Sequence, residues 1–170
     1  MSEFTKSNFI SNLLRLAPLI LLFISVLNEI DLNYLGIFSL NFPFILIFYW
    51  SLRKTEILGY GFIFFAGLIN DVVNGLPIGI SSFNYLLICG FAAYLRTITL
   101  RPSLVKDWFF FLFTILFINS LSYGILNLFF SVNFNYKDLF YNIFFTFIFY
   151  IFFANLFLIF QNRYLKEVND

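Results

Sequence analysis

Long apolar runs alternate with short polar segments along this entire sequence. A helix that crosses the hydrocarbon core of a bilayer, about 30 Å thick, needs roughly 17 to 25 mostly apolar residues. Six runs meet or approach this length, and they cover residues 12–28, 34–52, 57–73, 81–98, 108–130 and 140–161. The pattern therefore predicts an all-α, polytopic membrane protein, a bundle of about six transmembrane helices with short loops. The first run lacks a small-residue cleavage site after it, which favours a retained helix over a secretory signal.

The basic residues predict how such a bundle is oriented. If all six runs span, nine of the ten basic residues lie on one face of the membrane, namely Lys6, Arg15, Arg53, Lys54, Arg96, Arg101, Lys106, Arg163 and Lys166. Only Lys137 lies on the other face, beside Glu29, Asp31 and Asp138. Since loops rich in Lys and Arg stay in the cytoplasm, both termini are expected to be cytoplasmic. Trp50 and Trp108 then fall at cytoplasmic helix ends, where they are expected to act as interfacial anchors.

Composition supports this class and excludes others. The chain has 170 residues, of which 61% are hydrophobic and 11% charged, whereas a soluble domain carries about 25% charged residues. We therefore expect one integral membrane domain over 1–170. The net charge of +1 argues against a nucleic-acid surface, and the chain has no histidine and a single cysteine, Cys89. No metal site and no cofactor are expected.

One acid inside an apolar run is the most informative polar residue. Asp71 shares a helical face with Ile63, Gly67 and Gly75 at four-residue spacing, and Asn70 and Asn74 flank that face. The small residues on this face are expected to let a neighbouring helix approach closely. A carboxylate in hydrocarbon is costly, so it needs a partner or a function. The amides at the start of the next helix, around Ser81 and Ser82, are a candidate partner that would fasten the two helices together. Contact with a partner protein, and ligand or proton chemistry, are the other interpretations of Asp71.

A glycine-proline elbow follows this acid. Gly75, Pro77 and Gly79 suit a tight, partly dehydrated turn between the third and fourth predicted helices. The elbow is either an ordinary connection or a shaped surface.

Polar residues also recur at helical spacing in the later runs. They are Asn84 with Arg96 in the fourth run, Asn119, Ser120, Tyr123, Gly124 and Asn127 in the fifth, and Asn142, Thr146 and Tyr150 in the sixth. We expect these stripes to form contacts between helices. The polar residues of the third, fourth and fifth helices are also candidates to line a small cavity open to the outer face. None of the stripes contains paired carboxylates or a nucleophile-base set, so an enzyme is not expected.

The stretch from Pro43 to Arg96, about a third of the chain, resembles the MreD family of rod-shape-determining membrane proteins. The matching residues are Pro43, then Arg53 and Lys54, then Gly67-Leu68-x-x-Asp71, then Gly75-x-Pro77-x-Gly79, then Arg96. Ile78 stands where the family usually has leucine, a change that leaves the elbow intact.

The resemblance implies a non-catalytic component of the bacterial cell-elongation complex, which directs lateral peptidoglycan synthesis and sets rod shape. Such a protein is a multi-pass component of the inner membrane. Its implied partners are MreC, the actin-like MreB, RodA and penicillin-binding protein 2, together with membrane lipids. Asp71 and the elbow from Gly75 to Gly79 would then carry the contact with MreC. The alternative is a substrate-binding membrane subunit of an energy-coupling-factor type vitamin transporter, which has a similar size and number of helices.

Overall fold

The computed structural model describes residues 2–27, 40–99, 103–130 and 136–165, and all regular structure within these ranges is helical. The predicted all-α class is therefore confirmed for the described residues. Seven α-helices and one π-helical turn occur there, in the order α1 (Ser2–Leu27), α2 (Phe42–Arg53), α3 (Thr55–Leu58), α4 (Tyr60–Val73), α5 (Ile80–Ile98), α6 (Leu104–Phe130), α7 (Tyr136–Phe160) and η2 (Gln161–Leu165).

The short helix α2 lies at the centre of the packing. Ten of its 12 residues are buried, and they occupy all sides of the helix. A helix that is apolar all round is typical of a protein core or of a membrane span. Helices α1, α5 and α7 all pack against α2. Its start is fixed by Asn41, whose side-chain oxygen accepts a hydrogen bond from the Phe44 amide at 3.3 Å, while the Asn41 amide donates to Thr146 Oγ1 at 3.0 Å.

Two predicted spans have different limits in the structure. The span predicted over 34–52 is wrong at its start, because Leu40 and Asn41 are not helical and Asn41 caps α2. Residues 34–39 of that prediction lie outside the described residues. The span predicted over 57–73 is interrupted at Gly59, which has φ +64° and separates α3 from α4.

The helix of the first span, α1, begins at Ser2, ten residues before its predicted start. The three C-terminal spans agree better with the prediction. The run predicted over 81–98 forms α5 with a difference of one residue at its start. Helices α6 and α7 each begin four residues earlier than predicted, because the polar residues that precede the apolar runs continue the same helix. This extension brings Asp107 into the first turn of α6.

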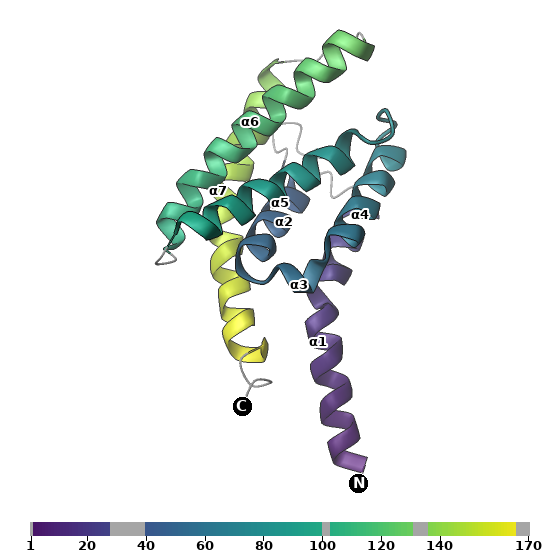
Figure 1. Ribbon diagram of the computed structural model, residues 1–170, viewed down its shortest axis with the longest axis vertical. Coiled ribbons are helices and arrows are strands. Elements are labelled where there is room, and N and C mark those ends of the chain that lie inside the picture. The colour runs from purple at the N-terminus through teal and green to yellow at the C-terminus, as the bar shows by residue number, and fades with distance from the viewer. Residues whose placement is uncertain (1, 28–39, 100–102, 131–135, 166–170) are drawn as a thin grey trace.

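Figure 1 shows how the helices are arranged. Helices α4 and α5 form a hairpin, and α5 returns diagonally across α2, with which it makes extensive contact. Helices α6 and α7 lie beside one another on the far side of α5 from α4, and α1 packs against α4 and α2. The start of α1 and the end of α7 lie at the same end of the molecule (Figure 1). The elbow between α4 and α5 lies at the opposite end.

The two tryptophans have packing roles. Trp50 is 1% exposed in the centre of the core, so its predicted role as an interfacial anchor is wrong. Trp108 is half-buried, stacks on Phe147 with ring centroids 4.4 Å apart, and donates from its indole N–H to the Phe147 carbonyl oxygen at 2.8 Å. Trp108 thus ties α6 to α7.

Apolar side chains are exposed on several helices. Two helical segments, Leu104–Phe130 and Tyr136–Arg163, are long and apolar enough to cross a membrane, and Leu14–Leu27, Phe42–Arg53 and Tyr60–Val73 are shorter apolar segments. Large hydrophobic residues such as Phe113, Phe117 and Phe152 are more than 40% exposed. An exposed apolar surface of this kind indicates association with a membrane.

The hairpin of α4 and α5 depends on a close approach at Gly67. A Cβ atom on Gly67 would overlap the backbone of Ser82, with only 2.5 Å to its nitrogen. The hydroxyl of Ser82 donates to the Phe64 carbonyl oxygen at 3.0 Å across the same contact. The sequence prediction that Gly67 lets a neighbouring helix approach is therefore confirmed.

We expect Gly67→Ala to destabilise the protein by roughly 1–3 kcal/mol, because the added methyl group forces α4 and α5 apart. Gly61→Ala is the matched control, since it lies in the same helix and a Cβ there meets nothing within 4 Å. Thermal unfolding in detergent measures both variants. Equal stability of the two variants would contradict the account of the hairpin.

Candidate functional site

The Asp71 carboxylate caps the helix that follows its own. Asp71 is 0% exposed, and its two oxygens accept hydrogen bonds from the Gly79 amide at 2.7 Å and the Ser81 amide at 2.8 Å. Amides at a helix start have no partner within the helix, and a side-chain oxygen at the N-cap usually accepts from them. The N-cap of α5 is Gly79, which has no side chain. Asp71 supplies the missing acceptor from α4, and its negative charge lies at the positive end of the α5 dipole.

The backbone of Asp71 closes the end of α4. Its carbonyl oxygen accepts from the Leu76 amide at 2.9 Å, and the Val72 carbonyl oxygen accepts from the Gly75 amide at 3.4 Å. This pair of bonds, with Gly75 at φ +63°, is the Schellman arrangement that ends many helices. Asp71 thus terminates one helix with its backbone and starts the next with its side chain.

The hydrogen bonds of Asp71 can be compared with the prediction that it fastens two helices through the amides near Ser81 and Ser82. The contact with the Ser81 amide is the one that the fastening interpretation predicts, and the Gly79 amide is an additional donor. Ser82 takes part through its hydroxyl group instead of its amide. Contact between Asp71 and a partner protein stays a prediction.

The elbow itself has a defined shape. Gly75 and Gly79 have φ values of +63° and +106°, a region that L side chains rarely adopt, which explains two glycines in this turn. Gly75 is exposed and lies beyond the end of α4, so the prediction that it shares the buried helical face of Ile63, Gly67 and Asp71 is wrong. Pro77 is half-buried, while Ile78 is 76% exposed.

A polar cavity of about 320 Å³ lies beside the elbow. Six helices, α1, α2 and α4 to α7, and the segments before α2 and α5 contribute to it. Its polar lining residues are Ser25, Asn41, Asn70, Asn74, Ser81, Asn84, Tyr85, Asn119, Ser122 and Asn142. Of the residues predicted to line a cavity, Asn70, Asn74, Asn84 and Asn119 line this one, and the structure adds polar residues from α1, from the cap of α2 and from α7. Its opening to the outer face of a membrane stays a prediction.

Hydrogen bonds hold several of these side chains in place. The Ser122 hydroxyl donates to Asn84 Oδ1 at 2.6 Å, and the Asn70 side-chain amide donates to Ser81 Oγ at 2.9 Å. The Asn119 side-chain amide donates to the Ile115 carbonyl oxygen in its own helix at 2.9 Å. The walls from α4, α5 and α6 are therefore fixed relative to one another.

Two predicted bundle residues lie elsewhere. Asn127 is exposed, so its predicted place on an inner polar face is wrong. Tyr123 is half-buried and contacts the ring of Tyr136, with centroids 5.4 Å apart, outside the cavity lining. The inner face of α6 is instead set by Asp107, Phe111, Thr114, Ile115, Ile118, Ser122 and Leu126. Asn119 lies at the edge of that face.

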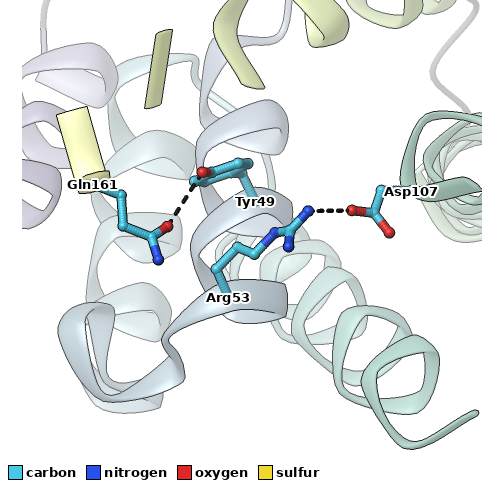
Figure 2. Close-up of polar contacts among 4 residues, drawn as sticks. All are labelled: Tyr49, Arg53, Asp107 and Gln161. Atoms are coloured by element: carbon cyan, nitrogen blue, oxygen red, sulfur yellow. Dashed lines mark hydrogen bonds and ion pairs between the residues drawn. The ribbon is translucent and has the colours of Figure 1, made fainter. Parts of the chain in front are cut away.

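A buried ion pair that the sequence reasoning missed lies at the other end of α2. The side chains of Arg53 and Asp107 are 18% and 2% exposed. The Nη2 atom of Arg53 lies 2.7 Å from Oδ2 of Asp107. One turn earlier in α2, the Tyr49 hydroxyl donates to Gln161 Oε1 at 3.3 Å. Figure 2 shows the two contacts extending from α2 in opposite directions, toward α6 and toward η2. These two contacts thus fix the end of α2 to α6 and to η2.

A signal for Asp107 was present in the sequence. Asp107 lies four residues before Phe111, and the series continues through Thr114, Ile118 and Ser122 at helical spacing. The predicted span begins at residue 108 and therefore leaves Asp107 outside it. The sequence pattern identifies Arg53 only as a basic residue of one membrane face and of the family-like motif.

No protein-family model, no curated protein and no solved structure matches this chain. Any function must therefore be argued from the residues of the elbow, the cavity and the ion pair.

We expect Asp71→Asn to lower stability by roughly 1.5–3 kcal/mol, because it removes the charge and one of two acceptors for buried amides. Asp138→Asn, at an exposed acid in the first turn of α7, should change stability by less than about 0.5 kcal/mol. Thermal unfolding of the purified protein in detergent measures the difference. Indistinguishable midpoints for the two variants would show that Asp71 does not hold the hairpin.

The Arg53–Asp107 pair makes a separate prediction. Arg53→Met should cost about 3–5 kcal/mol because it leaves the Asp107 carboxylate buried without a partner. The double variant Arg53→Met with Asp107→Leu should recover much of that loss. Lys106→Met, at an exposed neighbour, is the control. Additive losses in the double variant, measured by the same unfolding experiment, would contradict an ion-pair interaction.

Proposed function

We propose that this protein is a non-catalytic integral membrane component of the bacterial cell-elongation complex, similar to MreD, that supports lateral peptidoglycan synthesis by binding partners. The observation that supports the proposal is that the Asp71 carboxylate caps the start of α5. The residues of the family-like motif, from Gly67 to Gly79, form one fastened hairpin in which both Asp71 oxygens already accept hydrogen bonds. A carboxylate used in this way supports a role in shaping a surface better than one in proton transfer.

The proposed disposition is six membrane passes with both termini in the cytoplasm, in a bacterial inner membrane. Two features support it. The start of α1 and the end of α7 lie at one end of the molecule (Figure 1). The basic residues Arg53 and Arg96 lie in the last turns of α2 and α5, and Lys106 lies in the first turn of α6. In this proposed disposition the elbow and the cavity lie on the outer side.

The proposed contact surface is the outer side of the elbow. Ile78 and Val72 are 76% and 69% exposed there, next to a turn whose backbone is fixed by Asp71. A rigid turn with exposed apolar side chains loses little conformational entropy when a partner binds. In this proposal MreC contacts the elbow, and MreB, RodA and penicillin-binding protein 2 belong to the same assembly.

Site-specific photo-crosslinking in the native host tests this proposal. A benzophenone amino acid is placed at Ile78, and a matched copy carries it at Phe152, which is also exposed but lies on α7. We expect mass spectrometry to recover MreC from the Ile78 copy and much less of it from the Phe152 copy. Recovery of paired ATPases and a coupling membrane subunit would instead favour the vitamin-transporter alternative and contradict the proposal.

A further inference from the structure

We propose that the polar cavity beside the elbow binds an uncharged group rich in hydroxyl or amide functions, about the size of one sugar ring. The cavity volume of about 320 Å³ lies at the lower end of the roughly 300–1,000 Å³ of small-molecule sites. This inference is independent of the elongation-complex proposal, because it depends only on the walls of the cavity.

The described lining residues carry no charge, as expected for a site that binds a neutral ligand. Among the described residues that line the cavity, none is Asp, Glu, Lys, Arg or His. The nearest acid in the hairpin, Asp71, is 0% exposed and accepts from the Gly79 and Ser81 amides. None of these described lining residues offers a counter-charge to an anion or a cation, which favours an uncharged ligand.

The cavity walls hold hydrogen-bonding groups that the protein does not use. Asn84 and Tyr85 are 8% and 2% exposed and both line the cavity. Within the described residues, neither the side-chain NH₂ of Asn84 nor the Tyr85 hydroxyl takes part in a hydrogen bond. Because both residues line the cavity, these donors are available to a ligand that enters it.

Acceptors face the same space. Asn70 and Asn119 use their side-chain NH₂ groups to donate to Ser81 Oγ and to the Ile115 carbonyl oxygen. Their side-chain oxygens accept no hydrogen bond within the described part of the chain. Donors and acceptors together suit a ligand whose groups do both, as hydroxyl and amide groups do. Phe42 and Phe44 add apolar wall beside them, as in most small-molecule sites.

The same chemistry is offered by a free sugar and by the headgroup of a neutral glycolipid. The test therefore uses wild-type protein in phosphatidylglycerol nanodiscs with two kinds of probe. Glucose or N-acetylglucosamine is added to the solution, and monoglucosyldiacylglycerol is included in the bilayer. Binding is measured as a shift in the thermal unfolding midpoint and as retained ligand in native mass spectrometry. Glucose 6-phosphate is the charged comparison.

Asn119→Leu blocks the cavity, and Asn155→Leu is its matched control. Both asparagines lie in long helices and donate from the side chain to the carbonyl oxygen four residues earlier, but Asn155 is exposed and outside the cavity. We expect one neutral probe to bind wild type and Asn155→Leu, and to bind Asn119→Leu about tenfold more weakly or not at all. A response to the free sugars identifies a solute site, and a response only to the glycolipid identifies a headgroup site.

Three results would overturn the inference. They are no binding of any neutral probe to the wild type, equal binding of glucose 6-phosphate, and equal binding to the Asn119→Leu and Asn155→Leu variants. If Asn119→Leu fails to accumulate, Asn119→Cys in a Cys89→Ala background replaces it. The bound probe should then slow maleimide labelling of residue 119, and unchanged labelling would count against the inference.

Discussion

The structure depends on one interaction, the capping of α5 by a carboxylate that belongs to α4. The Ser81 amide at the start of α5 is buried and has no partner within its own helix, so another part of the protein must accept its hydrogen bond. Gly79 has to be glycine for its backbone conformation, and so it cannot supply a capping side chain. The Asp71 carboxylate supplies this missing acceptor. The same amides, at the positive end of the α5 dipole, stabilise a negative charge that would otherwise be costly in an apolar run. The shape of the elbow and the position of α5 follow.

The position of α5 in turn determines the cavity. Helix α5 contributes Ser81, Asn84 and Tyr85 to the lining, while α4 contributes Asn70 and the C-cap of α4 contributes Asn74. Any movement of the α4–α5 hairpin would therefore open or close this space. At the opposite end of α2, the Arg53–Asp107 pair fixes α6, which supplies the facing wall through Asn119 and Ser122. The two buried charge interactions thus hold the two sides of one site.

Sequence reasoning predicted the features that arise from local patterns. The all-α class, the limits of α5, the close contact at Gly67 and the bond from Ser81 to Asp71 all follow from periodicity, small residues and helix-end chemistry. The polar stripe of α4 and α5 likewise predicted a cavity, because its residues repeat at the helical period. These are effects of residues close together in sequence.

The errors have a common physical origin in tertiary packing. Trp50 was assigned to an interface because it lies beside basic residues, but α2 is covered on all sides and the indole is buried. The local pattern gives no reason to pair Arg53 with Asp107, because the two residues are 54 positions apart in the sequence. Asn127 was placed on an inner face by spacing alone, although the rotation of α6 is set by Phe111, Ile115 and Ile118. A single sequence does not specify such long-range partners.

Hydrogen exchange measured by mass spectrometry tests the central claim about Asp71 most directly. The comparison is between wild type and Asp71→Asn in the same detergent, over the peptides that cover residues 76–84 and those of α6 and α7. The account predicts that exchange of the amides at the start of α5 becomes faster, about tenfold or more, while α6 and α7 are unchanged. Unchanged exchange at the start of α5 would contradict the claim that this carboxylate holds the hairpin together.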